Sequence, residues 1–98
     1  MVKKIIKLSA VWCAPCRDFK KTFEKVSKLP EFGDIVFTDY DIEKDEESVD
    51  YVSKHQVRQI PATLILDEND DLIYKVMGNI PQNDFVNIIN EAKRRQTK

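Results

Sequence analysis

The sequence has few of the residues on which most cofactor and metal motifs depend. Its 98 residues include two glycines, one histidine and two cysteines, and the formal net charge is −1. The isolated Gly33 and Gly78 cannot form a Gly-rich nucleotide-binding loop. A net charge near zero provides no strong field to attract nucleic acid or an anionic membrane. We therefore expect no nucleic-acid partner, no membrane partner and no nucleotide cofactor.

Long apolar runs are also absent. The N-terminal run that ends at Ile6 is interrupted by Lys7 and is too short for a signal peptide or a membrane span. This predicts a cytoplasmic protein. Because that compartment is reducing, a structural disulfide is not expected there, and two cysteines are more often catalytic or metal-binding.

What is present is typical of a soluble globular domain, with 42% hydrophobic and 34% charged residues. The length predicts one domain over residues 1–98, and we expect a monomer. No repeat is visible, and the basic tail 93–98 is expected to be exposed and frayed.

The periodicity predicts an α/β fold with the order βαβαββα. Strands are expected at 2–9, 35–42, 62–66 and 72–77, and helices after Cys13, at 45–54 and from about Pro81. The two strands around the turn 68–71 form a predicted hairpin, and 55–61 is a predicted loop. Parallel strands need a covering crossover, so we expect a four-stranded mixed sheet with helices on both faces.

Three helical stripes define the candidate core. They are Phe19, Phe23, Val26 and Leu29 in the first helix, Val49 and Val52 in the second, and Phe85, Ile88, Ile89 and Ala92 in the third.

The candidate active site is the segment Val11-Trp12-Cys13-Ala14-Pro15-Cys16, between the first strand and the first helix. Residues three apart on a helical turn are neighbours, so the two cysteines can lie within disulfide range. Cys13 at the helix N-terminus is favoured as a thiolate, whereas Cys16 inside the helix should be more buried and stay protonated longer. This predicts Cys13 as the nucleophile and Cys16 as the resolving thiol. Pro15 suits a first turn and stiffens it.

Two other interpretations of the cysteines remain open. A structural zinc site normally needs four ligands, and beyond the cysteines the chain offers only His55. The cysteines could also be inert buried residues. A C-x-x-C motif beside a βαβ pattern favours redox chemistry over both.

These residues resemble the thioredoxin family over nearly the whole chain. The sequence W-C-A-P-C at 12–16 is similar to the family's W-C-G-P-C, and Trp12 makes it less similar to glutaredoxins. The segment V-R-Q-I-P at 57–61 resembles the family's V-R-x-I-P, in which the proline follows a cis peptide bond. Gly78, followed by a helix that begins near a proline, is a third match.

The resemblance implies a protein-disulfide reductase that needs no cofactor and is recycled by an external reductase such as a thioredoxin reductase. It also implies a cis Ile60–Pro61 bond beside the cysteines, which is a plausible isomer before proline. The substrate-contacting residues that it implies are Trp12, Ala14, Pro15, Ile60, Pro61 and Gly78.

The chain also departs from the family pattern. The extra N-terminal strand and helix of many thioredoxins are not expected here. Lys7 stands where thioredoxins usually have a buried aspartate, and Asp39 stands where they usually have a lysine. Strand alternation places Lys7 on the same face as Ser9, and a buried charge needs a partner. We therefore predict that Lys7 and Asp39 pair beneath Cys16 and tune its proton transfer; the alternative is a Lys7 that reaches solvent.

Two further expectations concern single residues. Ser9 stands where a second tryptophan is common, so the cleft there should be less aromatic and more polar. His55 is expected on the surface.

The function has two rivals. The rim around the sulfurs, formed by Trp12, Ile60, Pro61 and Gly78, could instead dock a partner protein, with the redox chemistry incidental, because one fold hosts many functions. The chemistry could also be glutathione-linked, as in glutaredoxins. The reduction potential, and with it the direction of electron flow, does not follow from the C-x-x-C spacing.

Overall fold

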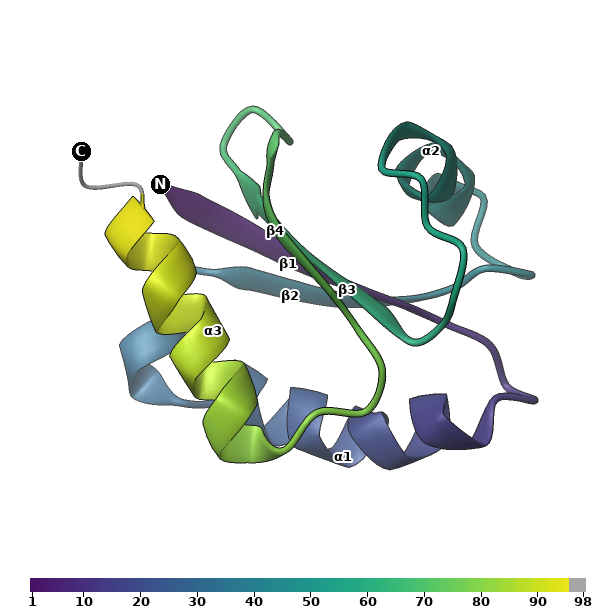
Figure 1. Ribbon diagram of the computed structural model, residues 1–98, viewed down its shortest axis with the longest axis horizontal. Helices are drawn as coiled ribbons and strands as arrows, with labels where there is room; N and C mark the ends of the chain where they lie inside the picture. Colours follow the sequence, from purple (N-terminus) through teal and green to yellow (C-terminus); the bar gives the residue numbers. More distant parts are fainter. Residues whose placement is uncertain (96–98) are drawn as a thin grey trace.

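The computed structural model describes residues 1–95, and it confirms the predicted order of elements (Figure 1). The elements are β1 (Val2–Ser9), α1 (Ala14–Ser27), the 3-10 turn η1 (Pro30–Phe32), β2 (Val36–Asp41), α2 (Glu47–Lys54), β3 (Ala62–Asp67), β4 (Leu72–Met77) and α3 (Gln82–Arg95). Because α3 continues to Arg95, residues 93–95 of the expected frayed tail are helical, and residues 96–98 of that prediction lie outside the described residues.

The four strands form one mixed sheet in the order β2-β1-β3-β4. β1 runs parallel to β2 and antiparallel to β3, and β3 and β4 form the predicted antiparallel hairpin. The parallel pair needs a crossover, which α1 supplies. β1 is a central strand, so its residues from Ile5 to Ser9 are all buried.

Helices cover both faces of the sheet, with α1 and α3 on one face and α2 on the other (Figure 1). The α1–α3 face holds a core in which the ring of Phe19 contacts those of Phe23 and Phe85, with centroids 6.1 and 5.3 Å apart. On the α2 face, Ile6, Leu8, Leu64 and Leu66 pack beneath that helix. The predicted α1 and α3 stripes are confirmed, although Leu29 and Ile88 are only partly buried.

Of the two residues predicted to face inward from α2, Val52 does so and Val49 does not. Val49 is 60% exposed, and the helix turns Ser48, Tyr51, Val52 and His55 toward the sheet. These positions still follow the i, i+3, i+4, i+7 spacing of a helix face. A pattern of hydrophobic residues alone selected Val49 because two of the four inward positions are polar.

The prediction that His55 lies on the surface was also wrong. Only 8% of the residue is exposed, and its ring stacks on that of Tyr51 at 6.4 Å. Its Nε2 atom has no hydrogen-bond partner within residues 1–95. Burial, followed by the nearby cations Lys54 and Lys75, lowers the pKa of His55 from its ordinary value of 6.5. The imidazole is therefore held neutral in the folded chain.

This buried imidazole predicts a loss of stability in mild acid. The unfolded chain takes up a proton near pH 6.5, whereas folded His55 resists it, so stability is complete above that value and falls as the pH drops. Urea unfolding at about pH 7.5 and about pH 5.5 should show a lower midpoint at the acidic pH. The variant His55→Phe keeps a ring against Tyr51, and its midpoint should fall less over the same interval. An equal fall in both proteins would contradict the assignment.

Candidate active site

Local hydrogen bonds explain why the cysteines sit at the start of a helix. The chain leaves β1 and turns where the N–H of Cys13 donates to the carbonyl of Ala10 at 3.1 Å. Cys13 is the extended N-cap of α1, and Pro15 lies in the first turn, where no backbone donor is needed. That turn contains no acidic side chain, so nothing on the helix itself offsets the positive end of its dipole.

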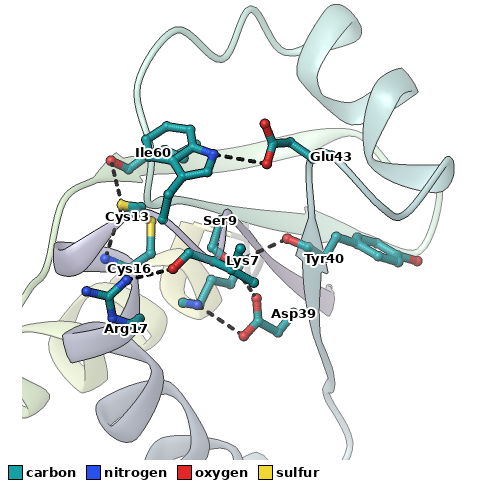
Figure 2. Close-up of a disulfide and its surroundings, with 11 residues drawn as sticks. Lys7, Ser9, Cys13, Cys16, Arg17, Asp39, Tyr40, Glu43 and Ile60 are labelled. Atoms are coloured by element: carbon teal, nitrogen blue, oxygen red, sulfur yellow. Dashed lines mark hydrogen bonds and ion pairs between the residues drawn. A yellow bond between two sulfur atoms is a disulfide. The ribbon is translucent and has the colours of Figure 1, made fainter.

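Cys13 and Cys16 form a disulfide, with Cα atoms 5.2 Å apart. The backbone N–H of Cys16 donates to the Sγ atom of Cys13 at 3.3 Å (Figure 2). Cys13 is 6% exposed and Cys16 is 1% exposed, in the predicted order. The sulfur of Cys13 thus belongs to the more exposed cysteine and is the one that accepts from a helix amide.

The loop before β3 brings a second segment to the outer sulfur. The Ile60–Pro61 peptide bond is cis, as predicted, and Cys13 Sγ lies 3.8 Å from the carbonyl oxygen of Ile60. Gly78 donates its N–H to the carbonyl of Pro61 at 2.8 Å, with a φ of +97° that suits glycine. The structure therefore brings Cys13, Ile60, Pro61 and Gly78 together from distant parts of the chain.

The residues flanking the cysteines are open to solvent. Ala14 and Pro15 are exposed, and Trp12 is 61% exposed. The indole N–H of Trp12 donates to Glu43 at 3.0 Å, and Arg17 donates to the carbonyl of Val11 at 2.6 Å (Figure 2).

Neither Glu43 nor Arg17 was predicted as a site residue. Arg17 lies one turn beyond Cys13, so helical spacing could have suggested it. Glu43 follows β2, 31 residues from Trp12, and no local pattern connects the two.

Lys7 and Asp39 form the predicted ion pair, with Lys7 Nζ 3.0 Å from Asp39 Oδ2. The two residues are register partners on β1 and β2. Lys7 has only 2% of its side chain exposed, so the alternative in which it reaches solvent is wrong. Ser9 donates to the other oxygen, Asp39 Oδ1, at 2.9 Å, and so holds the carboxylate in place (Figure 2).

A cavity of about 390 Å³ lies beside this pair, and Lys7, Ser9, Asp39 and Cys16 all line it. Ser9 lines this cavity at the position where a second tryptophan is common in thioredoxins. The sequence predicted a less aromatic and more polar cleft there. Cys16 therefore bonds to Cys13 on one side and faces this cavity on the other.

Residues 1–95 contain no group of three or more His, Cys, Asp or Glu side chains placed to hold a metal ion. No helix in the same range has the length and apolar content to cross a membrane.

The fold and the site together define a thioredoxin-fold protein with a disulfide-forming C-x-x-C pair. The thioredoxin family model matches residues 2–91, and the chain belongs to this family. It is 32% identical to thioredoxin H5 of Oryza sativa subsp. japonica over 75 residues, which is 76% of this chain and 52% of that protein. The chain thus spans about half the length of that relative.

Solved thioredoxin structures share the fold. The thioredoxin of Malassezia sympodialis (Mala s 13) has a TM-score of 0.75 and 24% identity, over 91% of this chain and 76% of that one. The thioredoxin of Fasciola hepatica has a TM-score of 0.74 and 20% identity, over 91% and 79% of the two chains.

Proposed function

We propose that the chain is a thiol–disulfide oxidoreductase that reduces protein disulfides through a reversible Cys13–Cys16 bond. The observation that supports it best is the disulfide at the N-terminus of α1, with the Cys16 amide directed at Cys13 Sγ. Electrons reside on the two sulfurs, so the reaction requires no cofactor. The partners that we propose are disulfide-containing proteins and an external reductase, in the cytoplasm, with a monomeric single domain as the active form.

In the proposed cycle, the dithiol form begins with Cys13 as a thiolate, which the Cys16 amide and the helix N-terminus stabilise. Cys13 attacks one sulfur of the substrate disulfide, forms a mixed disulfide and releases the other substrate sulfur as a thiolate. Cys16 then attacks Cys13 Sγ, which re-forms the internal bond and releases the second substrate sulfur. The two released thiolates take protons from water, and the substrate has gained two electrons.

The substrate would lie along the segment before β3. The backbone of Ile60 is next to the outer sulfur, so an extended peptide can pair with it as an added strand. The residues proposed to contact the peptide are Trp12, Ala14, Pro15, Ile60, Pro61 and Gly78. Their exposure or their position beside Cys13 is what supports the proposal.

Lys7 and Asp39 are proposed to tune Cys16 rather than to contact the substrate. Both line the cavity behind that sulfur and are bonded to each other. A charge placed there acts on the resolving step, because Cys16 must give up its proton before it can attack.

The test is a redox titration combined with a reduction assay. Incubated across glutathione redox buffers, the chain should pass between dithiol and disulfide in one two-electron transition. Its dithiol form should then reduce the disulfides of insulin, with dithiothreitol as the electron source, well above the rate with dithiothreitol alone. A chain that closes no internal bridge, or that leaves insulin untouched, would refute the proposal. Activity with glutathione as the sole reductant, and none with dithiol reductants, would favour the glutaredoxin-like alternative.

A further inference from the structure

A buried cation lies behind the resolving cysteine. Lys7 projects from β1 into the cavity that Cys16 also lines, on the side of the disulfide away from Ile60 (Figure 2). Its ammonium has three N–H donors, and in the described part of the chain one of them has an acceptor, Asp39 Oδ2. With 2% of the side chain exposed, the other donors cannot be satisfied by bulk solvent in the way that a surface lysine's are.

Asp39 offsets this charge only in part. Its side chain is 31% exposed, so solvent screens it, and its second oxygen accepts from Ser9. The buried member of the pair is therefore the cation, and its charge is less screened by bulk solvent than that of Asp39.

The other charges around the cavity do not displace Lys7 from this role. Arg17 and Lys20 on α1 are exposed, and Arg17 is bonded to the carbonyl of Val11. Asp41 accepts from the backbone N–H of Glu43, and Asp45 accepts from the backbone N–H of Asp41. Among the groups that line the cavity, Lys7 is the charged group with the least exposed side chain.

We infer that Lys7 stabilises the Cys16 thiolate electrostatically, with a free Nζ–H donating to Cys16 Sγ once the disulfide is open. The role of Cys16 as the resolving thiol rests on the proposed function, whereas the charge effect does not. When Cys16 loses its proton, the proton goes to water in the cavity, and no general base is required. The thiolate then bonds to Cys13 Sγ as the substrate sulfur leaves.

Asp39 and Lys7 therefore have opposite effects on Cys16. Removing the ammonium should disfavour the thiolate, and removing the carboxylate should favour it, because Asp39 is the carboxylate bonded to the ammonium and offsets part of its charge.

The experiment uses the variant Cys13→Ser, in which Cys16 is the single thiol. Ultraviolet absorbance of the thiolate is followed against pH in this protein and with Lys7→Met, Lys7→Arg, Asp39→Asn or Lys20→Met added. Lys7→Met should reduce the thiolate fraction at fixed pH by ~10-fold, and Asp39→Asn should increase it. Lys7→Arg keeps the charge and should remain near the parent. Lys20→Met, which removes an exposed cation from the same cavity, should change it by less than about 2-fold.

The outcomes separate this inference from the proposed function, because the titration involves no substrate. Equal curves for Lys7→Met and its parent, or a shift of Asp39→Asn in the same direction as Lys7→Met, would overturn the inference. Circular dichroism verifies that each variant is folded; if Lys7→Met is not, Lys7→Gln replaces it and Asp39→Asn still tests the predicted sign. A failed insulin assay with the predicted titrations would refute the function alone.

Discussion

Replacing Cys13 by serine is expected to abolish the reduction of protein disulfides, whereas replacing Cys16 by serine should stop the reaction one step later. Without Cys13, the remaining thiol is that of Cys16, which is only 1% exposed. No exposed thiolate is then available to attack the substrate. We expect insulin reduction to fall to the rate of dithiothreitol alone, a loss of at least about 10³-fold, as when a nucleophile is removed. Turbidity of precipitating insulin chains gives the rate.

With Cys16→Ser, Cys13 can still attack the substrate disulfide. The second thiol, whose Cα atom lies 5.2 Å from that of Cys13, is missing, so the bound substrate sulfur is not displaced. The mixed disulfide should accumulate. Mass spectrometry of the protein mixed with a disulfide-bonded peptide should show one covalent adduct, which dithiothreitol removes. The double variant Cys13→Ser/Cys16→Ser is the matched control and should show none.

The same pair of variants separates the rival functions. If Cys16→Ser turns over at the full rate with glutathione, a monothiol reaction is the better description. If Cys13→Ser retains the biological effect of the protein while insulin reduction is lost, the residues around the cysteines serve to dock a partner. The redox activity is then incidental. Neither result is expected, because the inner sulfur is placed to act on the outer one.

The sequence predicted best those elements in which a run of buried hydrophobic residues ends at a recognisable turn or polar segment. β1 and β4 were predicted to the residue because apolar runs end at a turn or a polar segment there. The Lys7–Asp39 pair was predicted because the resemblance places both residues where thioredoxins usually have an aspartate and a lysine. Alternation along β1 added the face on which Lys7 lies, and a buried ammonium requires an anion. The site at Cys13 followed from the motif and the resemblance.

The failures occur where a polar group takes a buried position. Ser48 and His55 face the sheet from α2, and Ser48 is satisfied there by donating to the carbonyl of Asp45 at 2.7 Å. Such local bonds make a polar residue tolerable in the interior and leave no trace in a hydrophobicity pattern. The Trp12–Glu43 bond was missed for a different reason, since it depends on how the segment after β2 meets that after β1.

The largest loss of stability among core substitutions is expected from Phe19→Ala. Phe19 is fully buried, its ring contacts those of Phe23 and Phe85, and it lies three residues after Cys16 on the inward face of α1. Removing a buried phenylalanine ring costs about 3–5 kcal/mol through lost burial and the cavity left behind. Because domains of this kind are stable by about 5–15 kcal/mol, the variant should fold but with a much lower urea midpoint.

Phe19→Leu, which refills much of the volume, is the matched control and should lose less than half as much. The slope of the urea transition should be unchanged in both, since the same surface is exposed on unfolding. A loss below about 1.5 kcal/mol for Phe19→Ala would mean that α1 is not held by this contact. The position of Phe19 makes the measurement relevant to function. It lies one helical turn beyond Cys16, and its ring packs against Phe85 of α3, so its loss should also loosen the start of α1, where the Cys16 amide supports Cys13.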